Sequence, residues 1–333
     1  MARIQLLVWD NRRGLTHDME LLASSLTELG HSVDVMALGS RRHDGRWRSL
    51  CMRARMMWRR LAPGESTTHL YDVNIALEHV RPPFFELARL NLLVPNPEWL
   101  SPRSQRYLGR FDAILCKTEH ARAMFDAEGY PTLRIGFDSQ DNYRPEVQKR
   151  RHFLHIAGAS PMKGTRRLVT LWERHPEWPK LLVLQSATEP VVPPCCRNAN
   201  IEIRSGFIEN PEELRHVQNE HAFHVCLSET EGWGHYIAEA MSCGAVVVTC
   251  DAPPMNELVR AERGLLVAAA RSRRFNMAQL YTFDEAALEA AVDRIMAMPD
   301  EEIATLGAHA RRWFEENRRS FAMRIENALR TLL

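Results

Sequence analysis

The sequence lacks long hydrophobic runs, paired zinc-binding cysteines and an excess of charge of one sign. Its first residues, MARIQLLVWD, hold an apolar run too short for a signal peptide or a membrane span, so we expect neither. The net charge of +1 creates no overall field that would attract nucleic acid. Seven cysteines without a pair of C-x2-C elements are typical of reduced thiols in a cytoplasmic protein.

What is present is a two-domain α/β pattern. The chain has 333 residues with 45% hydrophobic content, enough for two buried cores. Apolar runs alternate with amphipathic helices, which predicts two doubly wound, Rossmann-like domains. We place an N-terminal domain at 1–148, with its linker in the polar stretch 138–150, and a C-terminal domain at 149–316. The segment 317–333 has apolar residues at helical spacing, and we expect it to pack as a C-terminal helix, with the first domain as its candidate partner.

In the first domain, polar residues follow the predicted strands. Open α/β sheets bind ligands beyond the carboxyl ends of their strands. A single histidine at such a position is more often structural than catalytic, but three at one edge favour a cleft-lining role for at least one. The candidates on this side of the cleft are Asn11, Gly14, His17, His79 and His120.

Residues 41–61 form an unusual basic stretch in which eight arginines alternate with tryptophan and methionine. One interpretation is an ordinary surface helix with a solvated basic face. The other is a helix that binds an anionic membrane surface, with arginines on phosphates and tryptophans at the interface. Binding to nucleic acid is a weaker alternative, because the net charge is nearly neutral.

The segment 226–257 carries the most specific pattern of the chain. It predicts a strand, a turn bracketed by Gly232 and Gly234, a helix that Gly244 ends, and a second strand. Glu231 lies on the turn, and Glu239 lies in the helix, with seven residues between them. Alone, Glu231 reads as an ordinary turn residue and Glu239 as a solvated helix residue. Together with the glycines and strands, they favour a binding site at the helix N-terminus.

A second helix N-terminus follows the turn at 158–165, which contains Lys163. Small residues at a helix start, with one lysine, suit an anion, although the glycine spacing of a P-loop is absent. Two helix N-termini and a lysine suit a diphosphate, and a carboxylate such as Glu239 can accept hydrogen bonds from a ribose diol.

These motifs resemble a known family. EGWGHYIAEAMSCGAVVV is similar to the E-x7-E region of retaining GT-B glycosyltransferases, in the large group that includes bacterial lipopolysaccharide and mannosyl transferases. HIAGASPMKGTRRL resembles the diphosphate-binding turn of that family, and GFIENPEEL resembles its nucleobase loop. The resemblance is strong over about 152–267 and weak over 40–150. It implies a GT-B fold, in which two Rossmann-like domains face a central cleft. It also implies that the domain at 1–148 lies on the acceptor side and that the domain at 149–316 binds the nucleotide sugar.

The resemblance also implies an activity, namely transfer of a sugar from a nucleotide diphosphate sugar to a hydroxyl group, with retention of configuration. Catalytic roles fall on Glu231, which with the Gly232–Gly234 amides would hold the donor sugar, and on Lys163, which would neutralise the leaving diphosphate. Glu239 would bind the ribose. The full donor-binding set is Glu239, Gly232, Trp233, Gly234, Phe207, Ile208, Arg166, Arg167 and Asn256.

Partners follow from the same resemblance. We expect a nucleotide sugar as donor, a glycan or lipid-linked acceptor from bacterial polysaccharide, lipopolysaccharide or capsule synthesis, and no nucleic acid. No cofactor and no metal is expected, since the family needs none and the chain has no D-x-D carboxylate pair. The expected location is the cytoplasm, with peripheral contact to the inner face of the membrane through 41–61.

Two positions depart from the family pattern. An arginine usually stands five residues before the lysine, where this chain has Gly158, so Arg166, Arg167 or a first-domain arginine would supply that charge. The loop 251–257 is proline-rich where the family is glycine-rich, which leaves the donor sugar open. The alternatives to a transferase are a nucleotide-sugar epimerase, a phosphorylase of much longer chain, and a non-catalytic glycan- or nucleotide-binding protein.

Overall fold

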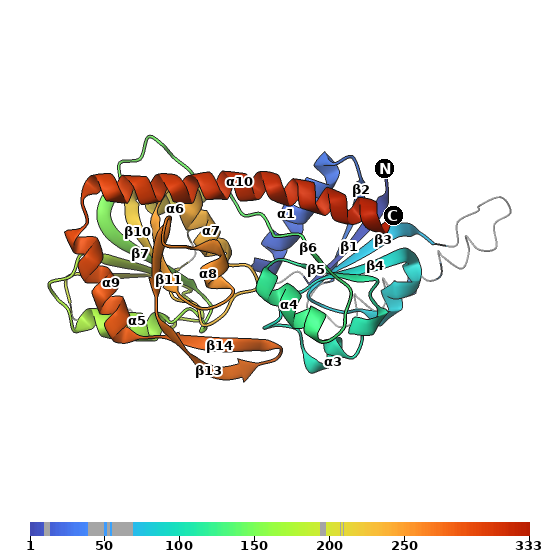
Figure 1. Cartoon of the computed structure of the whole chain (residues 1–333), viewed down its shortest axis with the longest axis horizontal. Coiled ribbons are helices and arrows are strands. Elements are labelled where there is room, and N and C mark those ends of the chain that lie inside the picture. The colour runs from blue at the N-terminus through green and yellow to red at the C-terminus, as the bar shows by residue number, and fades with distance from the viewer. Residues whose placement is uncertain are drawn as a thin grey trace. The chain divides into compact units, whose positions relative to one another are not determined.

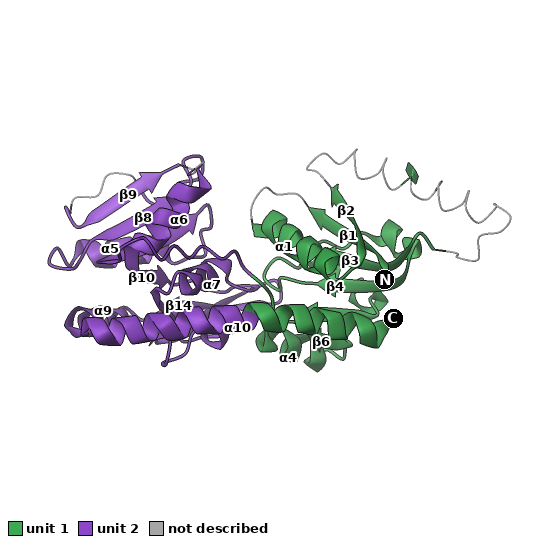
Figure 2. Ribbon diagram, turned by 90° about the horizontal axis from the view of Figure 1, so that it is seen from above, with its two compact units in different colours: residues 1–138, 318–333 green, residues 139–317 purple. Residues whose placement is uncertain are grey.

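The computed structural model describes residues 1–9, 14–38, 50–51, 54, 69–193, 198–206, 208 and 210–333. Contacts divide the chain into two compact units, which Figure 2 colours separately. Unit 1 contains Met1–Asp138 and Arg318–Leu333, and unit 2 contains Ser139–Asn317. Each unit is built around its own parallel six-stranded sheet, so the predicted α/β class is confirmed.

The sheet of unit 1 has the strand order β2-β1-β3-β4-β5-β6. Its strands are near-continuous apolar runs, as expected for parallel strands that are covered on both faces. The order reverses at β1, which lies between β2 and β3 (Figure 1). Its elements are β1 (Arg3–Trp9), α1 (Gly14–Glu28), β2 (Ser32–Leu38), β3 (Tyr71–Leu77), η1 (Pro82–Leu87), β4 (Ala88–Val94), α3 (Pro102–Gln105), η2 (Leu108–Arg110), β5 (Ala113–Cys116), α4 (Glu119–Ala127) and β6 (Thr132–Arg134).

The sheet of unit 2 has the order β12-β11-β10-β7-β8-β9, and it reverses between β7 and β10. Ligands of doubly wound sheets bind beyond the carboxyl ends of strands at such a reversal. The elements of unit 2 are β7 (Arg150–Gly158), α5 (Thr165–Glu173), β8 (Leu181–Gln185), β9 (Ile201–Ser205), α6 (Pro211–Glu220), β10 (His221–Cys226), α7 (His235–Ser242), β11 (Val246–Cys250), α8 (Met255–Leu258), β12 (Gly264–Val267), β13 (Ala269–Phe275), β14 (Ala278–Phe283) and α9 (Glu285–Ala297), followed by α10 (Asp300–Leu332).

The helix boundaries follow the capping residues in the sequence. The side chains of Thr118, Asn210 and Asp284 each accept a hydrogen bond from a backbone N–H of the helix that they precede. At the other end of α7, Gly244 adopts a φ of 63°, and the next amide, that of Ala245, bonds the carbonyl of Ala240. This bond and the Gly244 amide's bond to the Met241 carbonyl close a left-handed cap that only glycine adopts without strain. The strand-turn-helix-strand prediction around Glu231 is therefore confirmed.

Two features of unit 2 differ from the prediction. The antiparallel hairpin β13–β14 lies between β12 and α9, where no strand was expected, and Figure 1 shows it as a ribbon separate from the main sheet. The segment 317–333, predicted as a C-terminal helix of its own, is the last part of one longer helix, α10, of 33 residues. The polar stretch Asn317–Ser320 contains neither proline nor glycine, so nothing in it breaks the helix.

Helix α10 belongs to both units, and in Figure 2 it changes colour along its length. In unit 2, Gly307 lies so close to Gly244 that a side chain there would overlap the Gly244 carbonyl oxygen. In unit 1, Phe321 packs on Phe137 with ring centroids 5.2 Å apart. Among the described residues, no helix combines the length and apolarity that crossing a membrane requires.

The polar stretch predicted as a linker, 138–150, is bonded to unit 2. The backbone N–H of Asn142 donates to Ser242 Oγ at 3.0 Å, and the Asn142 carbonyl accepts from Asn219 Nδ2 at 2.7 Å. Arg144 forms a fork with the carboxylate of Glu212 at 2.8 to 3.2 Å. These bonds explain why the division of the chain falls at Asp138, earlier than the predicted boundary at 148/149.

Some predicted residues lie outside the described part of the chain. They are Asn11, Phe207 and, apart from Leu50, Cys51 and Ala54, the basic stretch 41–61. The interpretations attached to them stay predictions.

Candidate functional site

The turn before α7 is the centre of the candidate site. Gly234 caps the helix with a φ of 98°, and a Cβ atom there would lie 3.2 Å from Ile237 Cδ1. The carboxylate of Glu231 accepts a hydrogen bond from Ser228 Oγ at 2.5 Å, and that hydroxyl is also 2.5 Å from Tyr236 Oη. Glu231 is therefore held in place by Ser228, and Tyr236 in turn holds the Ser228 hydroxyl.

The flanking residues of the turn are buried. Trp233 is 4% exposed, and its indole N–H donates to Ser139 Oγ at 3.1 Å. The same Ser139 hydroxyl is 2.9 Å from His235 Nδ1. The Trp233 side chain thus anchors the turn within unit 2, and what Gly232, Trp233 and Gly234 offer a ligand is backbone.

Lys163 is held beside this turn by two contacts. Its ammonium group donates to the carbonyl of Ile156 at 3.0 Å and lies 3.9 Å from the centre of the Tyr236 ring. The next residue, Gly164, caps α5 with a φ of 67°, and a Cβ atom there would lie 2.7 Å from the Leu227 carbonyl oxygen. This close approach draws the turn with Lys163 against the end of β10, and only glycine permits it.

The three charged residues predicted for the site converge on the end of β10. Burial raises the pKa of the Cys226 thiol, and the charges of Lys163, Glu231 and Glu239 all act on the same thiol. Burial also raises the pKa of Glu239, while His235, Lys163 and a hydrogen bond with Gln218 lower it. The Lys163 ammonium therefore shares one region of unit 2 with the carboxylates of Glu231 and Glu239, although it lies far from both in the sequence.

A buried histidine supports the start of α5. His155 Nδ1 donates to the Val225 carbonyl at 2.8 Å, and its Nε2 accepts from Thr165 Oγ1 at 2.8 Å. Burial is the main cause that lowers the pKa of His155, to about 4, and the charge of Lys163 adds to it. The imidazole is neutral near pH 7 and joins β7, β10 and α5 behind the site.

Other predicted donor residues form contacts outside the Lys163–Glu231–Glu239 group. Arg166 donates to the Val191 carbonyl at 3.3 Å, while Arg167 pairs with Glu285 at 3.0 Å. Ile208 packs against a core cluster that includes Leu154 and Leu182. Asn256, in α8, donates to Asp251 Oδ1 at 3.0 Å within its own loop. None of these contacts joins the Lys163–Glu231–Glu239 group.

The described residues predicted for the acceptor side, Gly14, His17, His79 and His120, lie in segments that follow strands of unit 1, and a buried polar network ties these segments together. Lys117 donates to Asp18 at 2.5 Å and to Asn96 Oδ1 at 2.9 Å. Asn96 donates to Glu78 at 3.0 Å, and the other oxygen of Glu78 is 3.2 Å from His79 Nδ1.

This network spans the loops after four strands of unit 1. His17 neighbours Asp18 in α1, His79 ends the network, and His120 follows Lys117 closely in α4. Gly14 is the first residue of α1. Glu78 has a φ of 61°, which is uncommon for a residue with a side chain and directs its carboxylate into the network.

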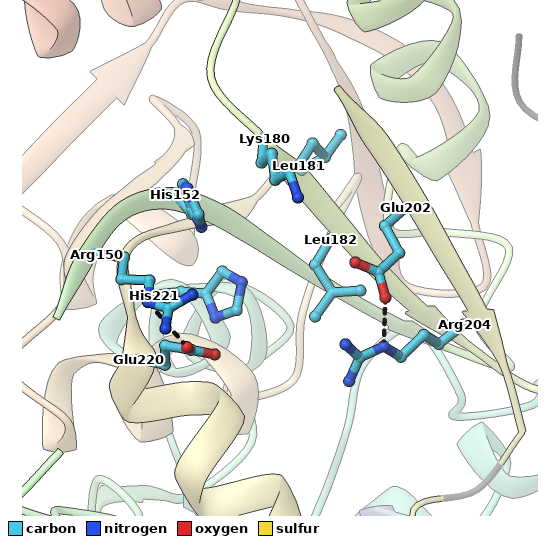
Figure 3. A pocket seen from close by; sticks show the side chains of 9 residues that line it. All are labelled: Arg150, His152, Lys180, Leu181, Leu182, Glu202, Arg204, Glu220 and His221. Carbon is cyan, nitrogen blue, oxygen red and sulfur yellow. Dashed lines mark hydrogen bonds and ion pairs between the residues drawn. The ribbon is translucent and has the colours of Figure 1, made fainter. Parts of the chain in front are cut away.

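Cavities lie at both ends of the strands of unit 2. One, of about 220 Å³, lies beside the candidate site and is lined by Pro161, Gly164, Thr165, Arg166, Arg167, Leu227, Glu229, Tyr281, Thr282 and Phe283. The other, of about 120 Å³, lies where β7, β8 and β10 begin (Figure 3). There Arg150 pairs with Glu220 and Arg204 with Glu202. The cavity at the carboxyl ends is therefore the one that belongs to the candidate site.

Among the described residues of either unit taken alone, no three His, Cys, Asp or Glu side chains lie close enough to share one ion.

Known proteins resemble this chain both in sequence and in fold. Residues 138–278 match the family model of the glycosyl transferases group 1, and no curated protein sequence matches the chain significantly. Anabaena Alr3699/HepE in complex with UDP-glucose superposes with a TM-score of 0.72 at 13% identity, over 99% of this chain and 100% of that one. The chain has the GT-B fold.

Further GT-B structures are similar over their whole length. Sucrose-phosphate synthase from Thermosynechococcus elongatus gives a TM-score of 0.70 at 14% identity and covers 100% of this chain and 99% of its own. A glycosyltransferase from Rickettsia africae gives 0.69 at 12% identity, with 98% and 97% coverage. At these identities the likeness establishes the fold, and the matched family segment coincides with the unit that holds Lys163, Glu231 and Glu239.

Sequence reasoning missed three contributors to the site. Ser228 donates a hydrogen bond to Glu231, and the ring of Tyr236 lies under the Lys163 ammonium group. The hairpin β13–β14 lines the adjacent cavity. Tyr236 occupies an apolar helix position and so reads as core. A sequence signal for the hairpin did exist, because polar and apolar residues alternate in part over 278–283. The turn that joins the two strands contains Asn276, which adopts a φ of 51°.

Proposed function

We propose that the protein is a glycosyltransferase that moves a sugar from a nucleotide diphosphate sugar to a hydroxyl group of a glycan or lipid-linked acceptor, with retention of configuration. The observation that carries this proposal is the convergence of Lys163, Glu231 and Glu239 beside the N-terminus of α7. The family match over 138–278 and the GT-B neighbours bound to UDP or UDP-glucose support it.

In this proposal, the leaving diphosphate binds where the ammonium of Lys163 and the free amides of α7 meet. A cation and helix N–H groups stabilise the negative charge that grows on the leaving oxygen. The contacts of Lys163 with the Ile156 carbonyl and the Tyr236 ring fix its position before the donor arrives. Preorganisation of this kind lowers the barrier because little rearrangement is needed during the reaction.

The two carboxylates take different hydroxyl groups. Glu231, held by Ser228, accepts hydrogen bonds from the donor sugar. Glu239, one helical turn inside α7, accepts from the ribose diol. Leaving-group stabilisation together with attack by the acceptor on the same face of the sugar retains configuration without a protein nucleophile. We also propose that no metal ion or cofactor is needed.

The test begins with ligand binding. In a thermal-shift screen, nucleoside diphosphates should raise the melting temperature, and the preferred base identifies the donor class. Replacing the carboxylate in Glu239→Gln should weaken nucleotide binding about tenfold, since a hydrogen bond to a charged group contributes roughly 1.5–3 kcal/mol. The matched control is Glu301→Gln, which changes an exposed carboxylate at the start of α10.

Turnover is the second measurement. Donor hydrolysis or transfer should fall by about 10²–10³ in Lys163→Gln, while Lys180→Gln, an exposed lysine, should leave it unchanged. Glu231→Gln should abolish turnover with nucleotide binding retained, and EDTA should have no effect. Nucleotide binding without turnover would identify a non-catalytic binding protein, and interconversion of the donor sugar would identify an epimerase. Full turnover in both Lys163→Gln and Glu231→Gln would refute the site.

Membrane contact through 41–61 is a separate proposal. Vesicles with anionic lipid should retain the protein, and glutamine at the arginines of this stretch should release it. Unchanged retention would remove the proposed location at the inner membrane face.

A further inference from the structure

The hairpin β13–β14 carries a group of cations that the transfer reaction described above does not use. Arg271, Arg273 and Arg274, here called the hairpin arginines, are all exposed on β13. Among the described residues, none of the three side chains forms an ion pair with a carboxylate. Most other arginines of unit 2, such as Arg144, Arg167 and Arg263, do form such pairs.

An irregularity in the pairing arranges these side chains. Arg271 pairs with Tyr281 and Arg274 with Gln279, so two residues of β13 between them face one residue of β14. Residues that pair directly across two strands share a face, and Tyr281 and Gln279 are two apart on one strand. The bulge therefore brings Arg271 and Arg274 to the same face of the hairpin, although three positions separate them.

That face also carries Tyr281, which is attached to the candidate site. The Tyr281 amide donates to the Glu229 carbonyl at 2.8 Å, and Glu229 lies two residues before Glu231. Tyr281, Thr282 and Phe283 line the cavity of about 220 Å³, together with Arg166 and Arg167. Buried Leu280 and Phe283 fix β14 against the unit, so the hairpin is a rigid support.

The third arginine, Arg273, acts through its charge on Glu229, which lines the cavity. Burial raises the pKa of Glu229, and the positive charges of Arg273 and Arg167 lower it. Glu229 is half-buried, and it is the single carboxylate among the residues that line this cavity. Arg166 and Arg167 line the cavity, and the hairpin that forms one of its walls adds three exposed arginines outside it, so this region favours an anion. Guanidinium forks match the oxygens of a phosphate group.

We propose that the hairpin arginines bind a phosphate group carried by the acceptor substrate, and so select phosphorylated acceptors. This inference rests on the proposed transferase function. The donor diphosphate has its own cation in Lys163, which is half-buried and held by Ile156 and Tyr236. The hairpin arginines are instead exposed to solvent and, among the described residues, are not paired with carboxylates, so they are available to a second phosphate group.

The experiment compares acceptors that differ only in a phosphate group. Purified full-length protein receives its nucleotide sugar together with either hexoses or the corresponding hexose 6-phosphates, and kcat/KM is measured for each pair. The wild type should prefer the phosphorylated member by about tenfold or more, because each hydrogen bond to a charged group contributes at least roughly a factor of ten. The preference should shrink as salt is added.

The triple variant Arg271→Gln, Arg273→Gln and Arg274→Gln should lose this preference and keep its affinity for the nucleoside diphosphate. The matched control is Arg312→Gln, Arg319→Gln and Arg330→Gln, which removes the same charge from exposed positions of α10 and should keep the preference. Melting temperatures of both variants report whether they fold.

Three outcomes would overturn the inference. Loss of nucleoside diphosphate affinity in the triple variant would assign the arginines to the donor. An unchanged preference, or none in the wild type, would leave them as charges that keep the open edge of β13 from pairing with other chains. A loss confined to retention on phosphatidylcholine vesicles with phosphatidic acid would assign them to the membrane. Failure of the transferase proposal itself is distinct, since donor turnover would then be absent in every variant.

Discussion

Mild acid should destabilise unit 2 through two histidines on neighbouring strands. His155 on β7 and His224 on β10 are fully buried and hydrogen-bonded to backbone carbonyls at 2.8 and 2.9 Å. Burial lowers the pKa of His155 to about 4 and that of His224 to about 3, from 6.5. Both imidazoles are therefore neutral in the folded protein at any pH near neutrality, whereas the unfolded chain takes up protons below pH 6.5.

The sign and size of the effect follow from this difference. The stabilising contribution of each histidine is complete above pH 6.5 and declines as the pH falls from 6.5 towards the folded value. At pH 5.0, about 1.5 pH units below the unfolded pKa, proton uptake by the unfolded chain lowers the free energy of unfolding by about 2 kcal/mol per histidine. The two together remove about 4 kcal/mol, a large part of the stability of an ordinary domain.

Urea unfolding at pH 7.5 and pH 5.0 measures this loss. Wild type is compared with His155→Gln, His224→Gln and the double variant, and the readout is the change in unfolding free energy between the two pH values. Other titrating groups cancel in the comparison. Each single variant should lose about 2 kcal/mol less than wild type on acidification. If all four proteins lost the same free energy, the histidines would not be the buried neutral groups described, and the reasoning would be wrong.

Three further predictions concern single residues. Gly164→Ala should cost about 2–4 kcal/mol in urea unfolding, because its φ is +67° and a carbonyl oxygen lies 2.7 Å from the new Cβ; Gly129→Ala, with a φ of +80° and open space, should cost only about 1 kcal/mol. Because burial raises the pKa of Glu239, nucleoside diphosphate affinity should rise with pH through that raised pKa as the carboxylate forms. Titration calorimetry measures this affinity, and a profile that does not change with pH would argue against the role of Glu239. Glu239→Gln should remove the rise. Arg311→Gln breaks the paired bonds to Asp141 and should expose 139–149 to limited proteolysis, at a cost of about 1–3 kcal/mol. Unchanged protease resistance would show that the other bonds of this segment suffice.

Much of the fold was predictable because local signals agree with one another. Parallel strands that are covered on both faces appear in the sequence as unbroken apolar runs. Helix starts are marked by Thr118, Asn210 and Asp284, which are residue types that commonly cap a helix N-terminus through a side-chain hydrogen bond. The turn around Glu231 was equally visible, since Gly234 and Gly244 adopt left-handed conformations that other residues avoid.

The rest depends on tertiary contacts that carry no local mark. Tyr236 lies at a helix position that predicts core packing, and only the fold places its ring 3.9 Å from the Lys163 ammonium. The contacts of Arg166 with the Val191 carbonyl and of Arg167 with Glu285 also join residues far apart in the sequence, and the expected role of these arginines toward phosphate stays a prediction. The site residues themselves stay predictions until a ligand is measured.

The shared helix α10 has a consequence for how the protein is made. Residues 318–333 complete unit 1 by packing Phe321 on Phe137, yet the ribosome adds them after the whole of unit 2. During synthesis, residues 1–138 must wait with part of their core uncovered while 139–317 emerge and fold. Unit 1 therefore begins to form first and is completed last, and removal of residues 318–333 would uncover part of its core.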